Sequence, residues 1–154
     1  IKKNMVIDLV FLNKYGLFGL LITTFIAYSI LPFPSEVAIT AFSTIFNPVH
    51  VFIFAMIGST LGSIANYYIG NRGVKRILKK NSKINNKVKK LFHKYGELSL
   101  LLFSWLPIIG DPLIILAGSV EMKFWKFLVY STIGKSFYFI VLIFLGAEIS
   151  TLIF

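Results

Sequence analysis

Two apolar stretches of this chain are each interrupted near the middle by prolines and one acidic residue. They are residues 29–40, with the sequence SILPFPSEVAIT, and residues 104–116, with the sequence SWLPIIGDPLIIL. Proline removes a backbone hydrogen-bond donor and ends a helix, and a carboxylate is costly in a lipid environment. Because the interruption occurs at matching places in two similar halves of the chain, it indicates a functional site.

The composition is that of an integral membrane protein. Of the 154 residues, 56% are hydrophobic and 16% are aromatic, and the mean hydropathy is +0.80. A water-soluble fold of this length cannot bury so much apolar surface, so lipid must cover part of it. We therefore expect residues 1–154 to form a single all-α domain that crosses the cell membrane several times.

The sequence lacks the residue patterns of an enzyme or a metalloprotein. It has no cysteine, no Ser-His-Asp set, no phosphate-binding loop and no paired-metal pattern. We expect no enzymatic activity, no metal and no cofactor, although the acidic residues of the interruptions could exchange protons.

The whole net charge of +10 lies in one basic segment, residues 71–95. Ten cations and no acid occur there, and elsewhere the cations equal the acids in number. Cytoplasmic loops of membrane proteins are rich in Lys and Arg, so we expect this segment in the cytoplasm, where it could attract anionic lipid headgroups. Its apolar residues follow helical spacing, with a break near Asn81 and Ser82, which predicts two amphipathic helices on the membrane surface. We expect no nucleic-acid partner.

The two halves of the chain resemble each other. Lys14-Tyr15-Gly16 returns as Lys94-Tyr95-Gly96, and Gly58 returns as Gly134. The offset falls from 80 to 76 residues across the interrupted stretch, and the order of the matches is kept. We therefore predict an internal duplication, with a first repeat at about residues 14–70 and a second at about 94–146.

Each repeat is predicted to contain one re-entrant helical hairpin and one continuous span. The continuous spans, residues 51–69 and 124–145, are close to the length of about 20 residues that crosses the hydrocarbon. The hairpins, residues 16–46 and 98–120, are built from shorter helices at residues 17–31, 37–46, 98–109 and 113–120. Irregular backbone at this depth is stable only where it is buried in protein or lines a wet cavity.

One hairpin and one crossing per repeat make the second repeat inverted relative to the first. Both mouths of the second hairpin are then cytoplasmic, and the uncharged link at residues 47–50 lies outside. Lys2, Lys3 and Lys14 disagree with this arrangement, which places them outside as well. In the alternative, residues 10–31 form a tilted full crossing and the N-terminus is cytoplasmic.

Glu36 and Asp111 are the acidic residues of the two interruptions, and the inverted arrangement brings both close to the middle of the bilayer. Burial and a second acid nearby both favour the protonated form of a carboxyl group, so the pair could load and release protons or bind a cation. In the alternative, each acid or its neighbour caps the second helix of its hairpin. The neighbours that we assign to the predicted site are Pro34, Ser35, Gly110 and Pro112.

Lys135 is the cation in the interior of a predicted span. The hairpin helices offer free N–H groups that suit a phosphate or carboxylate, and Lys135 could be the cation that pairs with such a ligand. Alternatively, its ammonium group extends to the cytoplasmic interface. Arg72 lies where a span meets the cytoplasm, so we expect it to anchor the helix, with headgroup binding as its lesser role.

Small and polar residues predict how one span packs. Gly58 and Gly62 form a small-residue face, which favours close helix packing, with homo-oligomerisation as the alternative. Asn66, Tyr67 and Tyr68 could face a cavity, and tyrosine is also common at membrane interfaces.

Three motifs follow one another along the chain. They are Pro-x-Pro-Ser-Glu at residues 32–36, GSTLGSIANYYIGNRG at residues 58–73 and LPIIGDPLIILAG at residues 106–118. In these motifs the chain resembles the DedA family of small membrane proteins, whose shared core is also called the VTT or SNARE-associated domain. The resemblance extends from about residue 15 to residue 146, and the Gly-Asp-Pro form of the third motif is similar to a divergent subgroup.

The resemblance implies two opposed re-entrant hairpins in an inverted repeat, with translocation of membrane lipid as the activity. Bacterial members of the family are linked to the recycling of undecaprenyl phosphate, and eukaryotic relatives to phospholipid scrambling. The acid of the family's first hairpin corresponds to Glu36. Many members carry arginines on both sides of the second hairpin's proline, whereas Ser104 and Gly110 occupy those positions here, which weakens the implied phosphate binding at this hairpin.

The leading prediction is a flippase or scramblase that moves the headgroup of a polyprenyl phosphate or a phospholipid through a cleft between the hairpin tips. Glu36 and Asp111 would switch by protonation. Two alternatives stay open. One is a proton-coupled transporter of a small solute or ion that uses the same acids, and the other is a membrane organising protein that acts through its basic segment.

Overall fold

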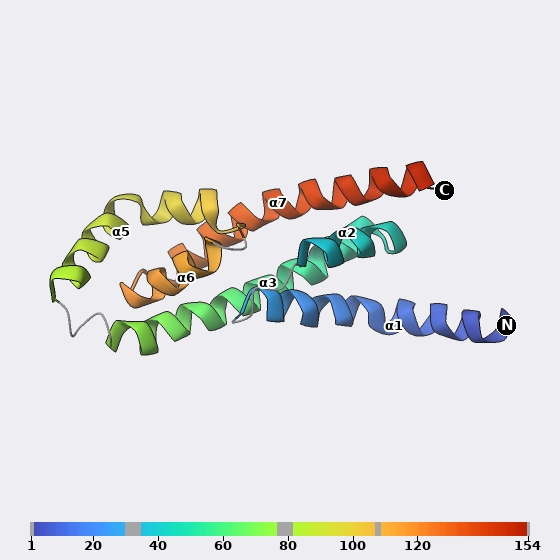
Figure 1. The fold of residues 1–154 in the computed structure, drawn as a ribbon, viewed down its shortest axis with the longest axis horizontal. Coiled ribbons are helices and arrows are strands. Elements are labelled where there is room, and N and C mark those ends of the chain that lie inside the picture. The colour runs from blue at the N-terminus through green and yellow to red at the C-terminus, as the bar shows by residue number, and fades with distance from the viewer. Residues whose placement is uncertain (1, 30–34, 77–81, 107–108, 154) are drawn as a thin grey trace.

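A computed structural model describes residues 2–29, 35–76, 82–106 and 109–153. These residues form helices and short turns and contain no strand, so the all-α prediction is confirmed for them (Figure 1). The elements in chain order are α1 (Lys2–Ala27), α2 (Ser35–Ile45), α3 (Pro48–Ile69), the π-helical turn η1 (Gly70–Val74), α5 (Ser82–Phe103), α6 (Gly110–Ser119) and α7 (Phe124–Ile153).

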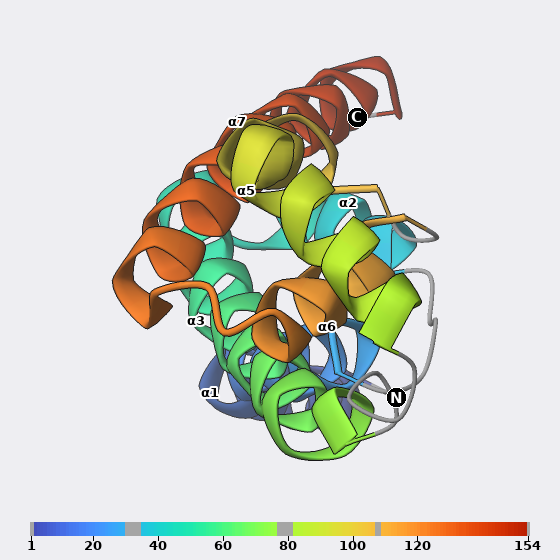
Figure 2. The ribbon, with the colours of Figure 1, turned by 90° about the vertical axis from the view of Figure 1, so that its left-hand side faces the viewer.

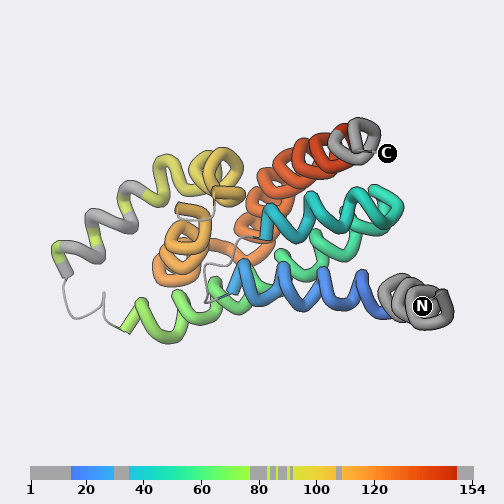
Figure 3. The backbone as a smooth tube through the Cα atoms, turned by 45° about the vertical axis from the view of Figure 1, so that its right-hand side comes forward, coloured from blue at the N-terminus to red at the C-terminus, as the bar shows by residue number. Residues whose placement is uncertain are grey.

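The helices α3 and α7 connect the two ends of an elongated molecule. Figure 1 shows α1 and α2 toward the end that holds both termini, and α5 and α6 toward the other end. Helix α1 packs on α3 and α2 packs on α7, while α6 packs on α3 and α5 packs on α7. The end-on view of Figure 2 and the backbone trace of Figure 3 show the same arrangement, in which α3 and α7 each contact helices from both ends.

Helix α3 has clear start signals in the sequence. The side chain of Asn47 accepts a hydrogen bond of 2.9 Å from the backbone N–H of Val49, and Pro48 occupies the first helical turn. Both are favoured residues at those positions, because asparagine satisfies a free N–H group and proline needs none. By length and composition, Pro48–Val74 and Phe124–Glu148 are the two described helices that could cross a membrane.

The helices next to the interruptions are longer than the spacing of apolar residues predicts. Helix α1 begins at Lys2 rather than at residue 17, because a single glycine such as Gly16 costs a helix only about 1 kcal/mol and does not end it. Helix α5 joins the second predicted amphipathic helix to the first arm of the second hairpin, since no proline separates them. The predicted break at Asn81 lies outside the described residues, and α5 begins at Ser82.

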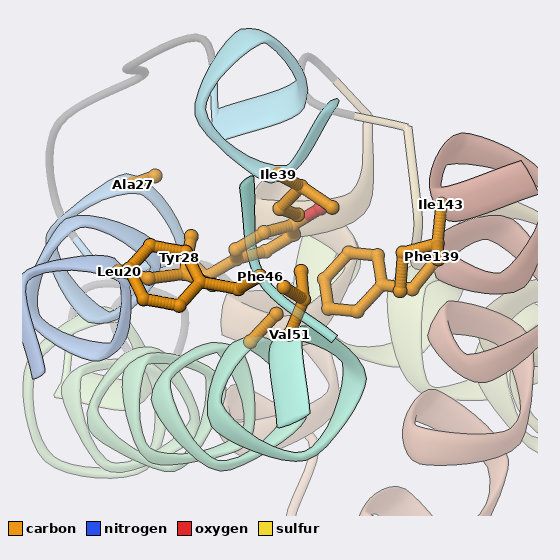
Figure 4. Close-up of a cluster of buried hydrophobic side chains, with 9 residues drawn as sticks. Leu20, Ala27, Tyr28, Ile39, Phe46, Val51, Phe139 and Ile143 are labelled. Atoms are coloured by element: carbon orange, nitrogen blue, oxygen red, sulfur yellow. The ribbon is translucent and has the colours of Figure 1, made fainter. Parts of the chain in front are cut away.

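Two separate apolar clusters form the core. The first core cluster combines side chains from α1, α2, α3 and α7 with two residues from adjoining turns (Figure 4): Leu20, Ala27, Tyr28, Ile39, Phe46, Val51, Ala55, Phe139 and Ile143. The second core cluster combines side chains from α3, α5, α6 and α7: Tyr67, Leu100, Ile114, Ala117 and Phe127. Each short helix next to an interruption, α2 or α6, therefore contributes to its own cluster.

Glycines allow α1 and α3 to pack in backbone contact. A Cβ atom added at Gly58 would meet the carbonyl oxygen of Leu21 and the hydroxyl of Thr24, and one added at Gly62 would lie 2.8 Å from the carbonyl oxygen of Tyr28. Such distances leave no room for a larger residue. The prediction that Gly58 and Gly62 mediate close helix packing is confirmed.

Candidate functional site

A stripe of polar side chains on α3 faces the inside of the helical bundle. Ser59, Ser63 and Asn66 are separated by four and three residues, and this spacing places them on one face of the helix. All three are buried, with exposed fractions of 1% or less. Buried polar groups need hydrogen-bond partners, so the neighbouring helices must supply polar groups opposite this stripe.

Helix α7 places the ammonium group of Lys135 against the stripe. Its Nζ donates hydrogen bonds to Ser63 Oγ and, at 3.3 Å, to the carbonyl oxygen of Ser59. It also lies 4.2 Å from the centre of the Tyr28 ring, an attractive cation–π position. Lys135 is only 1% exposed, so its charge is compensated inside the protein. The alternative in which this lysine extends to the membrane interface is therefore wrong.

Asn66 connects Asp111 of α6 to the same stripe. Its Nδ2 donates hydrogen bonds to Asp111 Oδ1 at 3.3 Å and to the carbonyl oxygen of Tyr28 at 3.1 Å. The Asp111 carboxylate also interacts electrostatically with the Lys135 ammonium. Since each charge partly compensates the other, the two ions are less costly to bury together than either would be alone.

Asp111 lies in the first turn of α6 without capping the helix. The N-cap residue is Ile109, whose side chain has no hydrogen-bond acceptor. A negative charge in a first turn is still favoured by the helix dipole. The carboxylate accepts its hydrogen bond from α3, so the capping alternative is wrong for Asp111.

Glu36 approaches the site from the first turn of α2. Its Oε1 is buried and has no hydrogen-bond partner among the described residues. Its carboxylate interacts electrostatically with the side chains of Tyr28 and Tyr138. Asp111 interacts electrostatically with Tyr28 as well. The two acids of the interrupted stretches therefore lie on α2 and α6 around one tyrosine.

Three buried polar atoms of the described residues lack a hydrogen-bond partner, and all three belong to this site. They are Tyr28 Oη, which interacts with the Ser35 side chain without a well-formed hydrogen bond, Glu36 Oε1 and Asn66 Oδ1. Each unsatisfied buried polar atom costs about 1–3 kcal/mol, so such atoms are rare and normally bind water or a polar ligand. Their concentration in one place distinguishes this site from the rest of the described chain.

We call these residues the polar layer: Tyr28, Glu36, Ser59, Ser63, Asn66, Asp111 and Lys135. The layer lies between the two core clusters along both long helices, and Tyr28 belongs both to the layer and to the first core cluster. On α3 its residues lie between Ala55 of the first core cluster and Tyr67 of the second, and on α7 Lys135 lies between Phe127 and Phe139. The middle of the molecule is therefore polar and both ends are apolar.

The other predicted site residues that the structure describes differ in burial and do not belong to the polar layer. Ser35 is buried at the start of α2, and Gly110 lies against the backbone of Ser104 at the start of α6. Pro112 is exposed, and Pro34 lies outside the described residues. Arg72 is exposed on η1, with its guanidinium 5.9 Å from the centre of the Tyr68 ring, and is not part of the polar layer.

Two ion pairs connect the helices at the edge of the molecule. Lys75 pairs with Glu121 in the turn between α6 and α7, and Lys126 of α7 pairs with Glu97 of α5. The hydrogen bond from Lys126 holds the pKa of Glu97 below its ordinary value. Exposed pairs of this kind contribute little stability, so we assign them no part in the polar layer.

The VTT domain family model matches residues 33–148, which include Glu36, Asp111 and Lys135. The chain belongs to the VTT domain family. This confirms the resemblance to the DedA family that the motifs indicate. Together with the two helices long enough to cross a bilayer, it identifies the chain as a membrane protein.

Several relatives of this VTT domain protein align with most of its length. An alkaline phosphatase-like protein of Lactococcus lactis subsp. lactis is 30% identical over 90% of this chain and 72% of its own. The inner membrane protein YqaA of Escherichia coli is 32% identical over 79% of this chain and 84% of its own. An uncharacterized protein of Methanocaldococcus jannaschii is 28% identical over 82% of this chain and 80% of its own. No solved structure matches the chain.

Sequence reasoning missed several residues of the polar layer in this VTT domain protein. Tyr28 lies at the centre of the layer, but it is only one of seven tyrosines in the chain. Ser59 and Ser63 could have been found from their spacing, because with Asn66 they form a polar stripe at helical intervals in an otherwise apolar span.

Proposed function

We propose that this VTT domain protein moves a membrane lipid from one leaflet to the other, with the headgroup crossing through the polar layer. The three buried polar atoms without partners carry this proposal: the Tyr28 hydroxyl can donate to a phosphate oxygen of a lipid headgroup, and Glu36 Oε1 and Asn66 Oδ1 can accept from a hydroxyl or ammonium group of the headgroup, while the lipid chains stay in the bilayer. The Lys135 ammonium in the same layer attracts a phosphate group. The substrate is accordingly a polyprenyl phosphate or a phospholipid.

The arrangement that we propose in the membrane is an inverted repeat of hairpin and crossing. Each hairpin consists of the two helices around an interruption, α1 with α2 and α5 with α6, and enters and leaves on one side. Figure 1 supports this, because both helices of each pair lie toward the same end of the molecule. The crossings are α3 and α7, and the hairpin tips meet at the polar layer.

Matching contacts in the two halves support the duplication. A Cβ added at Gly58 would meet the carbonyl oxygen of Leu21, and one added at Gly134 would meet the carbonyl oxygen of Leu101. The glycines are 76 residues apart and the leucines 80, which are the two offsets of the sequence repeat. In both halves a hydroxyl side chain three residues after the leucine is the second contact.

In this proposal Glu36 and Asp111 switch by taking up and releasing protons. With both ionised, the layer holds two negative charges beside Lys135, and an anionic headgroup is repelled. Protonation of either acid removes that repulsion and leaves Lys135 free to attract the phosphate. The basic segment at residues 71–95 faces the cytoplasm and increases the local concentration of anionic lipids there.

The proposal is tested with purified protein in liposomes that contain a fluorescent phospholipid or a fluorescent polyprenyl phosphate. Glu36→Gln and Asp111→Asn admit the headgroup but cannot ionise to release it, so we expect each to move lipid at least about tenfold more slowly than wild type, which corresponds to about 1.4 kcal/mol of barrier height. Glu148→Gln, a charge removal at an exposed position of α7, is the matched control and retains the wild-type rate. Equal rates for wild type and both acid variants would contradict the proposal.

The interaction between Asp111 and Lys135 also favours a second candidate, a proton-coupled transporter of a small solute or ion. Buried acids that interact with a buried cation are typical of proton relays in transporters. Proton uptake into vesicles that depends on added solute, without any movement of labelled lipid, would favour this candidate. The phosphatase-like name of one relative is checked in the same vesicles by release of phosphate from the labelled polyprenyl phosphate.

A further inference from the structure

An apolar groove of about 680 Å³ lies between α5 and α7 on the outer face of the bundle. Its residues come from the last turn of α5, the adjoining turn and three turns of α7: Leu101, Leu102, Trp105, Ile133, Gly134, Phe137, Tyr138 and Val141. Several of them are largely exposed, with Phe137 at 75% and Ile133 at 53%. In a membrane protein these side chains contact hydrocarbon, so the groove is open to the lipid.

The groove lies where the two halves of the chain differ in one residue, a tyrosine in place of a glycine. In the first half, Gly62 allows α3 to lie in backbone contact with α1 next to Tyr28. The position 76 residues later is Tyr138, whose ring stacks on Trp105 with 4.8 Å between the ring centres. The stacked rings therefore connect α7 to the turn after α5 at the position that corresponds to the backbone contact at Gly62.

The groove also touches the polar layer. The side chain of Tyr138 lines the groove and interacts electrostatically with the Glu36 carboxylate. At the other end of the groove, Gly134 is followed by Lys135, whose ammonium group points to the serines of α3. A molecule lying in the groove therefore has apolar walls along its length and a carboxylate and an ammonium group within the adjoining layer.

We propose that this groove binds one hydrocarbon chain of the transported lipid and holds its headgroup beside Tyr138, at the entrance to the polar layer. This proposal rests on the proposed function and adds the site at which the lipid binds before its headgroup crosses the membrane. A hydrocarbon chain fits because the walls are aliphatic and aromatic and the groove is open to the bilayer along its side. The headgroup belongs at Tyr138 because the side chain of this residue lines the groove and also packs against the first core cluster, which contains Tyr28 of the polar layer.

Photolabelling tests the proposal in liposomes that contain the full chain. One probe is a phospholipid with a photoreactive acyl chain, and the other is a polyprenyl phosphate with a photoreactive isoprenoid chain, so that the two arms distinguish the two lipid classes. We expect label from at least one probe to concentrate on residues 101–105 and 133–141. The surface of α1 and α3 around Gly62 is the internal control, since the two helices lie in backbone contact there, and we expect it to receive little label.

Two substitutions fill the groove without touching the polar layer. Ile133→Trp and Val141→Trp each place an indole ring in it, and we expect labelling there to fall severalfold and the lipid transport rate to fall with it. Val129→Trp adds the same ring to an exposed position of α7 outside the groove. It leaves the labelling of the groove and the lipid transport rate unchanged. Size-exclusion chromatography and thermal unfolding of each variant show that the fold is retained.

Even labelling of all lipid-facing helices, or groove labelling that survives both filling substitutions, would overturn the proposed chain site. If the wild-type protein moves lipid but shows either of these labelling results, only the chain site is contradicted and the proposed function is not. Conversely, labelling confined to the groove in a protein that moves no lipid supports the chain site and contradicts the proposed function. The two proposals can therefore fail separately.

Discussion

At the scale of single residues, Lys135 supplies the positive charge of the polar layer. Its ammonium group contacts the serine stripe of α3 and the ring of Tyr28, and it interacts with Asp111. A buried ion without a partner costs several kcal/mol, so Lys135 and Asp111 depend on each other. Charge, in addition to apolar packing, therefore couples α6 to α7.

Replacing Lys135 by methionine leaves the Asp111 carboxylate without its compensating charge. We expect Lys135→Met to lower the free energy of unfolding by about 3 kcal/mol, and the double variant Lys135→Met/Asp111→Asn to recover most of the loss because it removes both charges. Thermal unfolding in detergent micelles measures both effects, and exposed Lys123→Met is the control that changes little. If the double variant loses as much free energy of unfolding as the two single variants lose together, the two residues do not interact.

The charged residues of the site could be predicted from the sequence, and its neutral members could not. Glu36, Asp111 and Lys135 are conspicuous because charge is rare in apolar segments. Tyr28 and Ser59 belong to residue types that are common in membrane helices, and their part in the site depends on which helices lie opposite. Which helices lie opposite these residues cannot be read directly from the sequence.

At the scale of secondary-structure elements, the contact between α1 and α3 depends on glycines. Gly58 and Gly62 remove the side chains that would separate the two backbones. Helices in a membrane gain no hydrophobic energy from meeting each other, so close packing and hydrogen bonds must hold them together. The position of Tyr28 in the polar layer follows from this contact, because Tyr28 directly follows α1.

Alanine at Gly62 tests that contact. Its Cβ would lie 2.7–2.8 Å from backbone atoms of Phe25 and Tyr28, so we expect Gly62→Ala to lower the free energy of unfolding by about 1–3 kcal/mol through overpacking. Gly19 lies in α1 with open space around it, and Gly19→Ala should stabilise the helix by about 0.5–1 kcal/mol. Thermal unfolding of the two variants checks the opposite signs. A Gly62→Ala variant as stable as Gly19→Ala would mean that the helices do not touch there.

The existence of the helices could be predicted from the sequence better than their ends. The first continuous span was predicted to begin at residue 51 after a link at residues 47–50, but α3 begins at Pro48, because Asn47 caps the helix and proline is favoured in its first turn. Helix α5 was predicted as two helices, since its first half is amphipathic and its second half is apolar. A change of environment does not break a helix, however, and α5 runs without a break from Ser82 to Phe103.

At the scale of the whole molecule, the proposed inverted repeat makes a prediction about sidedness. The chain has no cysteine, so single cysteine substitutions can be labelled without background. We expect Lys14→Cys and Asn47→Cys to react with a membrane-impermeant maleimide from outside the cell, because they lie at the two ends of the first hairpin. Lys123→Cys should react only after the membrane is permeabilised.

The same labelling distinguishes the alternative for the first repeat. If α1 is a full crossing, Lys14→Cys and Asn47→Cys react from opposite sides of the membrane, and the first hairpin does not exist. A reaction of Lys123→Cys from outside would instead reverse the assigned orientation of the basic segment.

Lipid movement by the wild-type protein tests the central claim most directly. Vesicles are prepared with a headgroup-labelled phospholipid or polyprenyl phosphate in both leaflets, and an impermeant reductant then destroys the label that it can reach. We expect vesicles containing the protein to lose the label of both leaflets while an enclosed soluble dye survives. Loss confined to the outer leaflet for both lipids, as in vesicles without protein, would contradict it.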